Sequence, residues 1–214
     1  MNRWQVSLRT LFVITLLIGL AVAFVLNFNR MKNAETALEQ LRKEVGYLGP
    51  SEEDEVAAVR IASDEPLVWQ TRVRIPAKHR YRVAYSAVWR QATSKPDWFA
   101  AQPVPEGESV ITLRVMKDPR DDKWRISTIV RHENGVGRIG TVLPDDVSVV
   151  FRGSHDVVSG GIGRQTVLRP LGEPVRLLDE RYFSGVSLLL YGDRAPEADI
   201  IGIFAELQPD IGPL

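Results

Sequence analysis

Residues 67–89 have the sequence LVWQTRVRIPAKHRYRVAYSAVW, in which apolar and polar side chains alternate on both sides of Pro76. A period of two is typical of half-buried β-strands. The stretch therefore predicts an antiparallel hairpin with one buried, aromatic face and one wet, basic face. The predicted buried face consists of Leu67, Trp69, Thr71, Val73, Ile75, Tyr81, Val83, Tyr85, Ala87 and Trp89.

The wet face of this hairpin is the one candidate binding surface in the sequence. It carries five arginines that could hold an anionic glycan, lipid headgroups or an acidic protein. The simpler interpretation is an ordinary solvated sheet face whose charges pair with nearby carboxylates. The five candidate residues are Arg72, Arg74, Arg80, Arg82 and Arg90.

Further strand signals follow, so we expect a mainly β protein with a β-sandwich or jelly-roll-like domain over residues 67–214, with roughly eight or nine strands. Ser109–Met116 and Trp124–His132 predict a second hairpin around the turn 118–122. Ser94–Gly107 contains three prolines and predicts a long loop. The C-terminal half offers five strand candidates: Val147–Phe151, Gln165–Leu168, Val175–Leu178, Val186–Tyr191 and Ile200–Leu207.

Upstream, residues 10–29 (TLFVITLLIGLAVAFVLNFN) contain no charged side chain. As a helix they span about 30 Å, the thickness of a bilayer core, and predict a single-pass transmembrane helix in the cell membrane. The alternative is a signal peptide that is cleaved after residues 21–23. The apolar run continues through Phe28, beyond this cleavage site, which argues against a signal peptide. The basic tail 1–9 favours an N-terminus inside and a β domain outside the cytoplasm, although the Lys and Arg residues after the span, counted alone, favour the reverse.

Residues 30–48 predict a stalk helix that continues out of the span. Its apolar residues follow a heptad spacing, which is typical of a short parallel coiled coil. Such a coiled coil would make the chain, anchored in the lipid bilayer by its transmembrane helix, a homo-oligomer. The alternative is a single amphipathic helix. The acidic segment 49–66 is expected to be a linker before the β domain, and its short apolar run Val56–Ala62 fits either a helix or a strand. The predicted seam consists of Met31, Ala34, Leu38, Leu41, Val45 and Leu48.

The chain resembles a group of single-pass membrane proteins from planctomycete bacteria. The resemblance rests on SLRTL at 7–11, LRKEVGYL at 41–48 and LVWQTRVRIP at 67–76 running into YRV at 81–83. It covers about the first half of the chain. It implies the architecture of anchor, stalk and β-rich domain, and it brings no activity and no site residues with it.

Composition excludes several kinds of chemistry. With no cysteine there is no disulfide, thiolate metal site or thiol nucleophile, and 27 basic against 27 acidic residues give no case for a nucleic-acid partner.

Gly135–Gly140 matches G-x-G-x-x-G, but strand-and-turn sequence follows it, so a glycine-rich β-turn is expected rather than a dinucleotide site. Ser154-His155-Asp156 lacks the geometry of a triad. The histidines and the aspartates of 118–122 lack metal-ligand spacing. No cofactor, metal or catalytic residue is expected.

These observations favour a structural or binding module of the cell envelope, with an anionic envelope component or envelope protein as partner. One alternative is a membrane-anchored hydrolase whose carboxylate site forms only in the fold. The other is an accessory subunit that faces the cytoplasm in a membrane complex.

The anchor makes a direct prediction. Leu17→Asp places a charge near the centre of the span, which should cost about 2.5 to 3.5 kcal/mol of insertion free energy and release protein from the membrane. Membrane fractionation measures this release. A mature N-terminus at Phe24 in the wild-type protein would instead identify a cleaved signal peptide.

Overall fold

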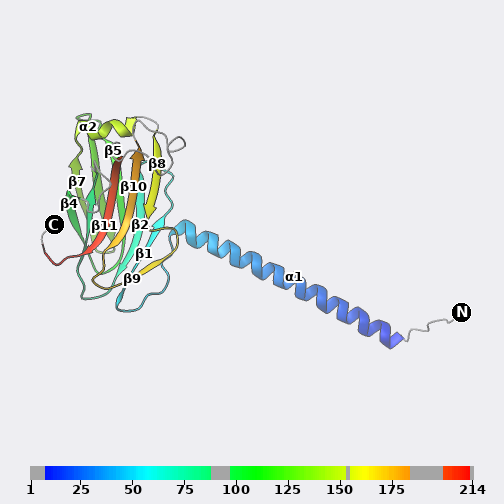
Figure 1. Ribbon diagram of the computed structural model, residues 1–214. Helices are drawn as coiled ribbons and strands as arrows, with labels where there is room; N and C mark the ends of the chain where they lie inside the picture. The colour runs from blue at the N-terminus through cyan, green and yellow to red at the C-terminus, as the bar shows by residue number, and fades with distance from the viewer. Residues whose placement is uncertain (1–7, 88–96, 153–154, 184–199, 213–214) are drawn as a thin grey trace. The chain divides into compact units, whose positions relative to one another are not determined.

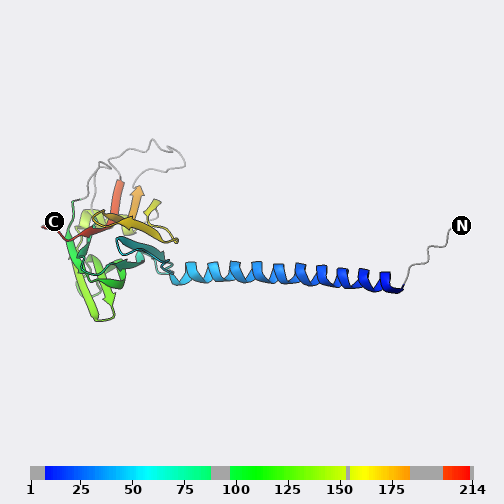
Figure 2. The same cartoon turned by 90° about the horizontal axis from the view of Figure 1, so that it is seen from below.

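The computed structural model describes residues 8–87, 97–152, 155–183 and 200–212. It is divided into two compact units, Met1–Arg42 and Lys43–Leu214. The first consists of most of helix α1 (Leu8–Val45), which Figure 2 shows as one unbroken helix. Its side chains are exposed along its length, and it is long and apolar enough to cross a membrane. It is thus a membrane anchor or a signal sequence, as its apolar composition predicts.

Helix α1 ends at Val45, within the predicted stalk segment 30–48 and directly before Gly46, which with Gly49-Pro50 is one of the two helix stops that the sequence predicts. Gly46 follows Val45 with φ +61°, the left-handed conformation with which glycine commonly terminates helices. Leu48, predicted as the last seam residue, lies beyond the helix and is buried together with Ala57 and Val59. The predicted coiled-coil seam therefore loses its last member, while its role in oligomerisation stays a prediction.

The second unit is a β-sandwich, which confirms the predicted fold class. Its two sheets are antiparallel and face each other. Figure 1 shows that the strand axes of the two sheets are roughly aligned. Sheet A has the strand order β7-β6-β5-β2-β1-β9, and sheet B has the order β4-β3-β11-β10-β8. The strands are β1 (Glu55–Ile61), β2 (Val68–Ile75), β3 (Tyr81–Ser86), β4 (Ala100–Val104), β5 (Gly107–Lys117), β6 (Trp124–His132), β7 (Gly135–Val142), β8 (Asp156–Gly161), β9 (Val167–Pro170), β10 (Val175–Phe183) and β11 (Ile200–Pro209).

The predicted pairing of the first two strands into a hairpin is wrong, although both strands form and the predicted face of each is buried. β2 pairs with β1 and β5 in sheet A, whereas β3 pairs with β11 and β4 in sheet B. The intervening residues 76–80 carry the chain from one sheet to the other. Val73 and Tyr85 are buried as expected, because two apolar faces can meet across a sandwich as well as side by side. Trp89 lies outside the described residues.

Segment 49–66, predicted as a linker, contains a strand of the domain. β1 lies between β2 and β9, and Val56 to Val59 are fully buried. Val56 and Ala58 face the interior of the sandwich, while Leu48 packs with Ala57 and Val59 on the opposite side of β1. Burial on both faces gives a continuous apolar run without alternation, which is why the periodicity did not identify this strand.

Other elements also differ from the predictions. The predicted second hairpin is confirmed, since β5 pairs with β6 across the turn 118–122. Part of the predicted proline loop is strand β4. Pro103 is compatible with β4 because this strand pairs on one side only, with β3. The predicted strand at 147–151 is instead α2 (Asp145–Ser148) followed by a 3₁₀ turn (Val149–Arg152). β8 was not predicted, β9 begins two residues later than expected, and Val186–Tyr191 lies outside the described residues.

A buried ion pair joins the two sheets. Glu180 of β10 in sheet B is 4% exposed, and its Oε1 accepts hydrogen bonds from Arg60 Nη2 (3.0 Å) and Trp69 Nε1 (3.1 Å) of sheet A. Its Oε2 accepts one from the Ser159 hydroxyl (2.6 Å) of β8. The carboxylate is satisfied by three donors from three strands, as a buried charge must be.

Breaking this pair should destabilise the sandwich. Arg60→Met leaves the Glu180 carboxylate buried without its cation, and we expect a loss of about 2 to 3 kcal/mol of unfolding free energy, less than for a fully buried pair because Arg60 is 22% exposed. Urea unfolding of the full chain in detergent, followed by tryptophan fluorescence, measures this loss.

The double variant Arg60→Met/Glu180→Gln is the control, since it leaves no charge buried and should regain part of the lost stability. A double variant as unstable as the sum of the two single changes would contradict a coupled pair.

Candidate anion-binding face

The fold separates the five arginines that the sequence placed on one surface. Arg72 and Arg74 point outward from sheet A, whereas Arg82 belongs to β3 in sheet B. Arg80 is exposed at the end of the connection between the sheets. Arg90 lies outside the described residues. The predicted common surface does not form, because β2 and β3 are not neighbours.

Arg74 fastens the chain segment after α1 to the sheet. Its Nη1 donates to the Gly49 carbonyl (3.0 Å) and to Ser51 Oγ (3.3 Å), and its Nη2 lies 2.6 Å from Glu108 Oε1. Thr166 Oγ1 holds the same segment by accepting the Gly49 amide (2.9 Å). Arg82 is also engaged in the fold, by Asp210 (3.7 Å) and the Gly212 carbonyl. These two arginines have structural contacts.

A different set of arginines shares the outer face of sheet A. Alternate residues of paired strands point to the same side, so the register places Arg72 in one row with Val110 and Arg131, and Arg114 in another row with Ser127. Arg138 of β7 stands opposite Ile129 of β6 and faces the same way. We call the four residues Arg72, Arg114, Arg131 and Arg138 the arginine face.

The arginine face has unbalanced charge. Within the described ranges, no carboxylate lies within ion-pair distance of any of its four guanidinium groups. Two of the four arginines contact hydroxyls: Arg114 Nε donates to Ser127 Oγ (3.2 Å), and Arg131 Nη1 lies 3.4 Å from Thr112 Oγ1. Thr112 and Ser127 are nearly buried on this outer face, which is what long arginine stems lying across a sheet produce.

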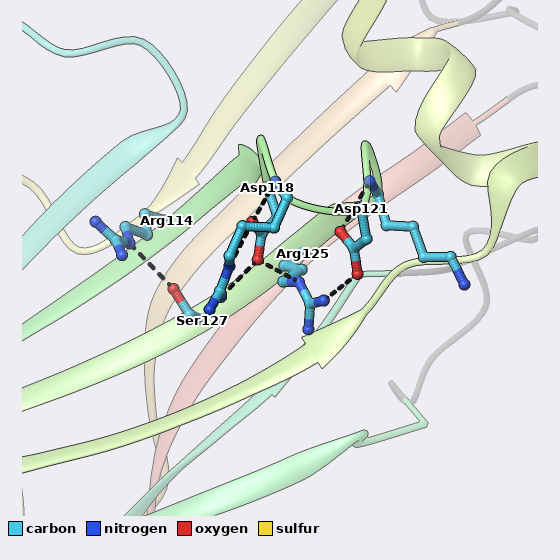
Figure 3. Close-up of polar contacts among 7 residues, drawn as sticks. Arg114, Asp118, Asp121, Arg125 and Ser127 are labelled. Carbon is cyan, nitrogen blue, oxygen red and sulfur yellow. Dashed lines mark hydrogen bonds and ion pairs between the residues drawn. The ribbon is translucent and has the colours of Figure 1, made fainter.

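The β5–β6 turn carries a second group of charges, which pair with one another (Figure 3). Asp118 accepts from Arg120 at both carboxylate oxygens (3.1 and 2.9 Å), and Arg125 Nε lies 3.1 Å from Asp118 Oδ2. Arg125 also pairs with Asp121. The hydrogen bond from the Arg120 side chain, followed by that from its backbone amide, holds the pKa of the Asp118 carboxyl far below its usual range. Asp118 is therefore ionised at any physiological pH.

A shallow depression of about 370 Å³ lies where the turn meets the arginine face. Strands β5, β6 and β7 form its floor, and Figure 3 shows Arg114 and Ser127 on one side of Asp118 and Arg125. Four arginines and one aspartate line it, so its charge is positive. The lining residues are Arg114, Met116, Asp118, Pro119, Arg120, Arg125, Ser127, Arg138 and Gly140.

The weaker sequence motifs do not form sites. Gly135–Gly140, expected as a glycine-rich turn, is most of edge strand β7. The glycines lie within the strand and do not open a helix, and α2, which follows β7, has only four residues, so the arrangement of a pyrophosphate site is not formed. Ser154 of the Ser-His-Asp sequence lies outside the described residues. Asp118 and Asp121 bind arginine, and no group of His, Asp and Glu in the described part of the chain could hold a metal ion.

Two depressions contain the carboxylates that a hydrolase would need. One of about 360 Å³ contains Glu180, whose oxygens are occupied by Arg60, Trp69 and Ser159. The other, of about 830 Å³, is lined by five glutamates. Two of these accept backbone amides: Glu106 from Lys78, and Glu55 from Glu52. Glu180, Glu106 and Glu55 are therefore engaged in contacts of the fold.

Comparison with known proteins found no matching family model, no matching curated protein and no matching solved structure. The resemblance to planctomycete membrane proteins therefore stays a prediction. The inferences below rest on the geometry of this chain alone.

The two outward arginines of β2 form a matched pair for a test. Arg74→Ala should remove the contacts to Gly49 and Ser51, cost about 1 kcal/mol and speed amide hydrogen exchange across residues 46–52. Arg72→Ala should change stability by no more than about 0.5 kcal/mol and leave this exchange unchanged. Exchange mass spectrometry of the full chain measures both, and equal exchange in the two variants would mean that Arg74 does not fasten the segment.

Proposed function

We propose that the protein is a membrane-anchored binding module of the cell envelope, and that its sandwich domain binds an anionic polymer through the arginine face. Helix α1 provides the anchor, and the basic tail 1–9 supports an N-terminus inside with the domain outside the cytoplasm. The heptad spacing in α1 supports self-association in the membrane.

The observation that carries the proposal is the set of four arginines without carboxylate partners in the described ranges. Neighbouring strands lie about 4.8 Å apart, so arginines on β2, β5, β6 and β7 cover a width of three strand spacings, or about 14 Å. A charge spread over that width suits a ligand with several negative groups. The affinity for such a ligand increases with each ion pair that forms and decreases as the salt concentration increases.

The composition of the face favours a polymer over a folded protein partner. Protein interfaces concentrate aromatic side chains at their centres. The outward positions of β2, β5, β6 and β7 contain arginine, polar and aliphatic residues and one carboxylate, Glu108, which pairs with Arg74. Trp69 and Trp124 point inward and pack against the core.

A charge-matched pair of variants tests the proposal. The full chain in nanodiscs of zwitterionic lipid is titrated with fluorescent dextran sulfate over a series of NaCl concentrations. Arg72→Gln/Arg131→Gln should weaken binding about tenfold at low salt, since two exposed ion pairs contribute about 1.4 kcal/mol together. The melting temperature should not change, because both residues are on the surface.

The control variant is Arg164→Gln/Arg169→Gln, which removes the same charge from exposed residues near strand β9 at the opposite edge of sheet A. It should bind as the wild type does. Equal weakening in both double variants would show that net charge alone attracts the polymer, and no binding by the wild type would refute the proposal.

A further inference from the structure

We propose that the depression between β5, β6 and β7 is a subsite for one tetrahedral oxyanion, a phosphate or sulfate group of the ligand. The proposal rests on the function proposed above and specifies the chemical class of the group that the arginine face recognises. Arg114, Ser127 and Arg138 provide the donors, and Gly140 provides the space.

Arg114 and Ser127 form a pair of positioned donors. The Ser127 hydroxyl oxygen accepts from Arg114 Nε (3.2 Å), which fixes the plane of the guanidinium over the sheet. The two Nη groups of Arg114 have no partner in the described part of the chain, and neither does the hydroxyl proton of Ser127. The serine is only 7% exposed, so an anion in the depression is the acceptor that this proton can reach.

Gly140 keeps the floor of the depression open. It stands opposite Ser127 in the β6–β7 register, in the same row as Arg114. A β-carbon there would lie 3.4 Å from the Ser127 β-carbon and from the Ile126 carbonyl oxygen. A larger side chain at 140 would therefore occupy the space above the serine hydroxyl, between Arg114 on one side and Arg138 on the other.

The arginines of the turn stand at the rim of the same depression. Asp118 engages Arg120 at both carboxylate oxygens and Arg125 at one, and Asp121 engages Arg125 as well. Since both oxygens of Asp118 are already engaged by cations, it repels an incoming anion less than a free carboxylate would. After subtraction of Asp118 and of Asp121, which pairs with Arg125, the four arginines of the lining retain two positive charges.

The arrangement of donors favours a tetrahedral group over a carboxylate. Arg114 on β5, Ser127 on β6 and Arg138 on β7 place donors on three neighbouring strands around the depression. A phosphate or sulfate ester presents three terminal oxygens in a matching arrangement, and guanidinium binds such groups through paired N–H donors. A carboxylate offers two oxygens in one plane and leaves a donor unpaired.

The test compares three fluorescent polymers of equal charge density on the full chain in zwitterionic nanodiscs: dextran sulfate, polyphosphate and carboxymethyl dextran. The wild type should bind one or both of the tetrahedral polymers about tenfold more tightly than the carboxylate polymer, and the stronger of the two identifies the group. Gly140→Val should remove this preference while leaving the affinity for carboxymethyl dextran within about twofold. Gly163→Val is the control, because Gly163 is exposed and has nothing within 4 Å of an added β-carbon.

Ser127→Ala is the second variant and decides the outcome if Gly140→Val does not fold. It keeps the surface charge and removes only the hydroxyl, so it should also reduce the preference several-fold. A preference that is absent in the wild type, or unchanged in both variants, overturns the subsite. Loss of binding in Arg72→Gln/Arg131→Gln alongside such a result would leave the function proposed above intact.

Discussion

The sandwich depends on one nearly buried carboxylate, that of Glu180. Glu180 is held by donors from both sheets, so the sheets cannot separate or slide without leaving a charge unpaired in the interior. Apolar packing between the sheets is tolerant of small shifts, whereas this hydrogen-bonded group requires Arg60, Trp69 and Ser159 at fixed positions. The contact thus sets the registry of the two layers, and with it the side of sheet A that faces outward.

The arginines divide into two kinds by their partners. Arg60, Arg74 and Arg82 satisfy groups that belong to the fold, and their charges are balanced locally. Those of the arginine face lie over hydroxyls and aliphatic side chains, which cannot neutralise them. A guanidinium that covers its own sheet costs little to keep in place, because its stem is buried while its donors remain in water. Such residues are ready to bind an anion without rearrangement.

Periodicity predicted strands well and their neighbours poorly. The inward faces of β2 and β3 are those that alternation indicates, and β5 and β6 pair as expected because a short polar turn joins them. Alternation says nothing about which strand lies beside which, so β2 and β3 were wrongly paired and Arg72 was grouped with Arg82. β1 has no alternation to detect, since Leu48 covers its second face. Arg114, Arg131 and Arg138 come from three strands, and only the register of sheet A shows that they meet.

The edges of the two sheets matter for a chain anchored as proposed. Molecules held in one bilayer meet repeatedly in the same orientation, which favours growth of chains of domains joined strand to strand. Pro103 deprives β4 of a backbone donor, and Gln102 of β4 lies against the position of Gly137 on β7, so these two edges shield each other. β9 is four residues long and ends at Pro170. These features protect β4, β7 and β9 against pairing between molecules, whereas β8, the other edge of sheet B, exposes Val157 and Val158.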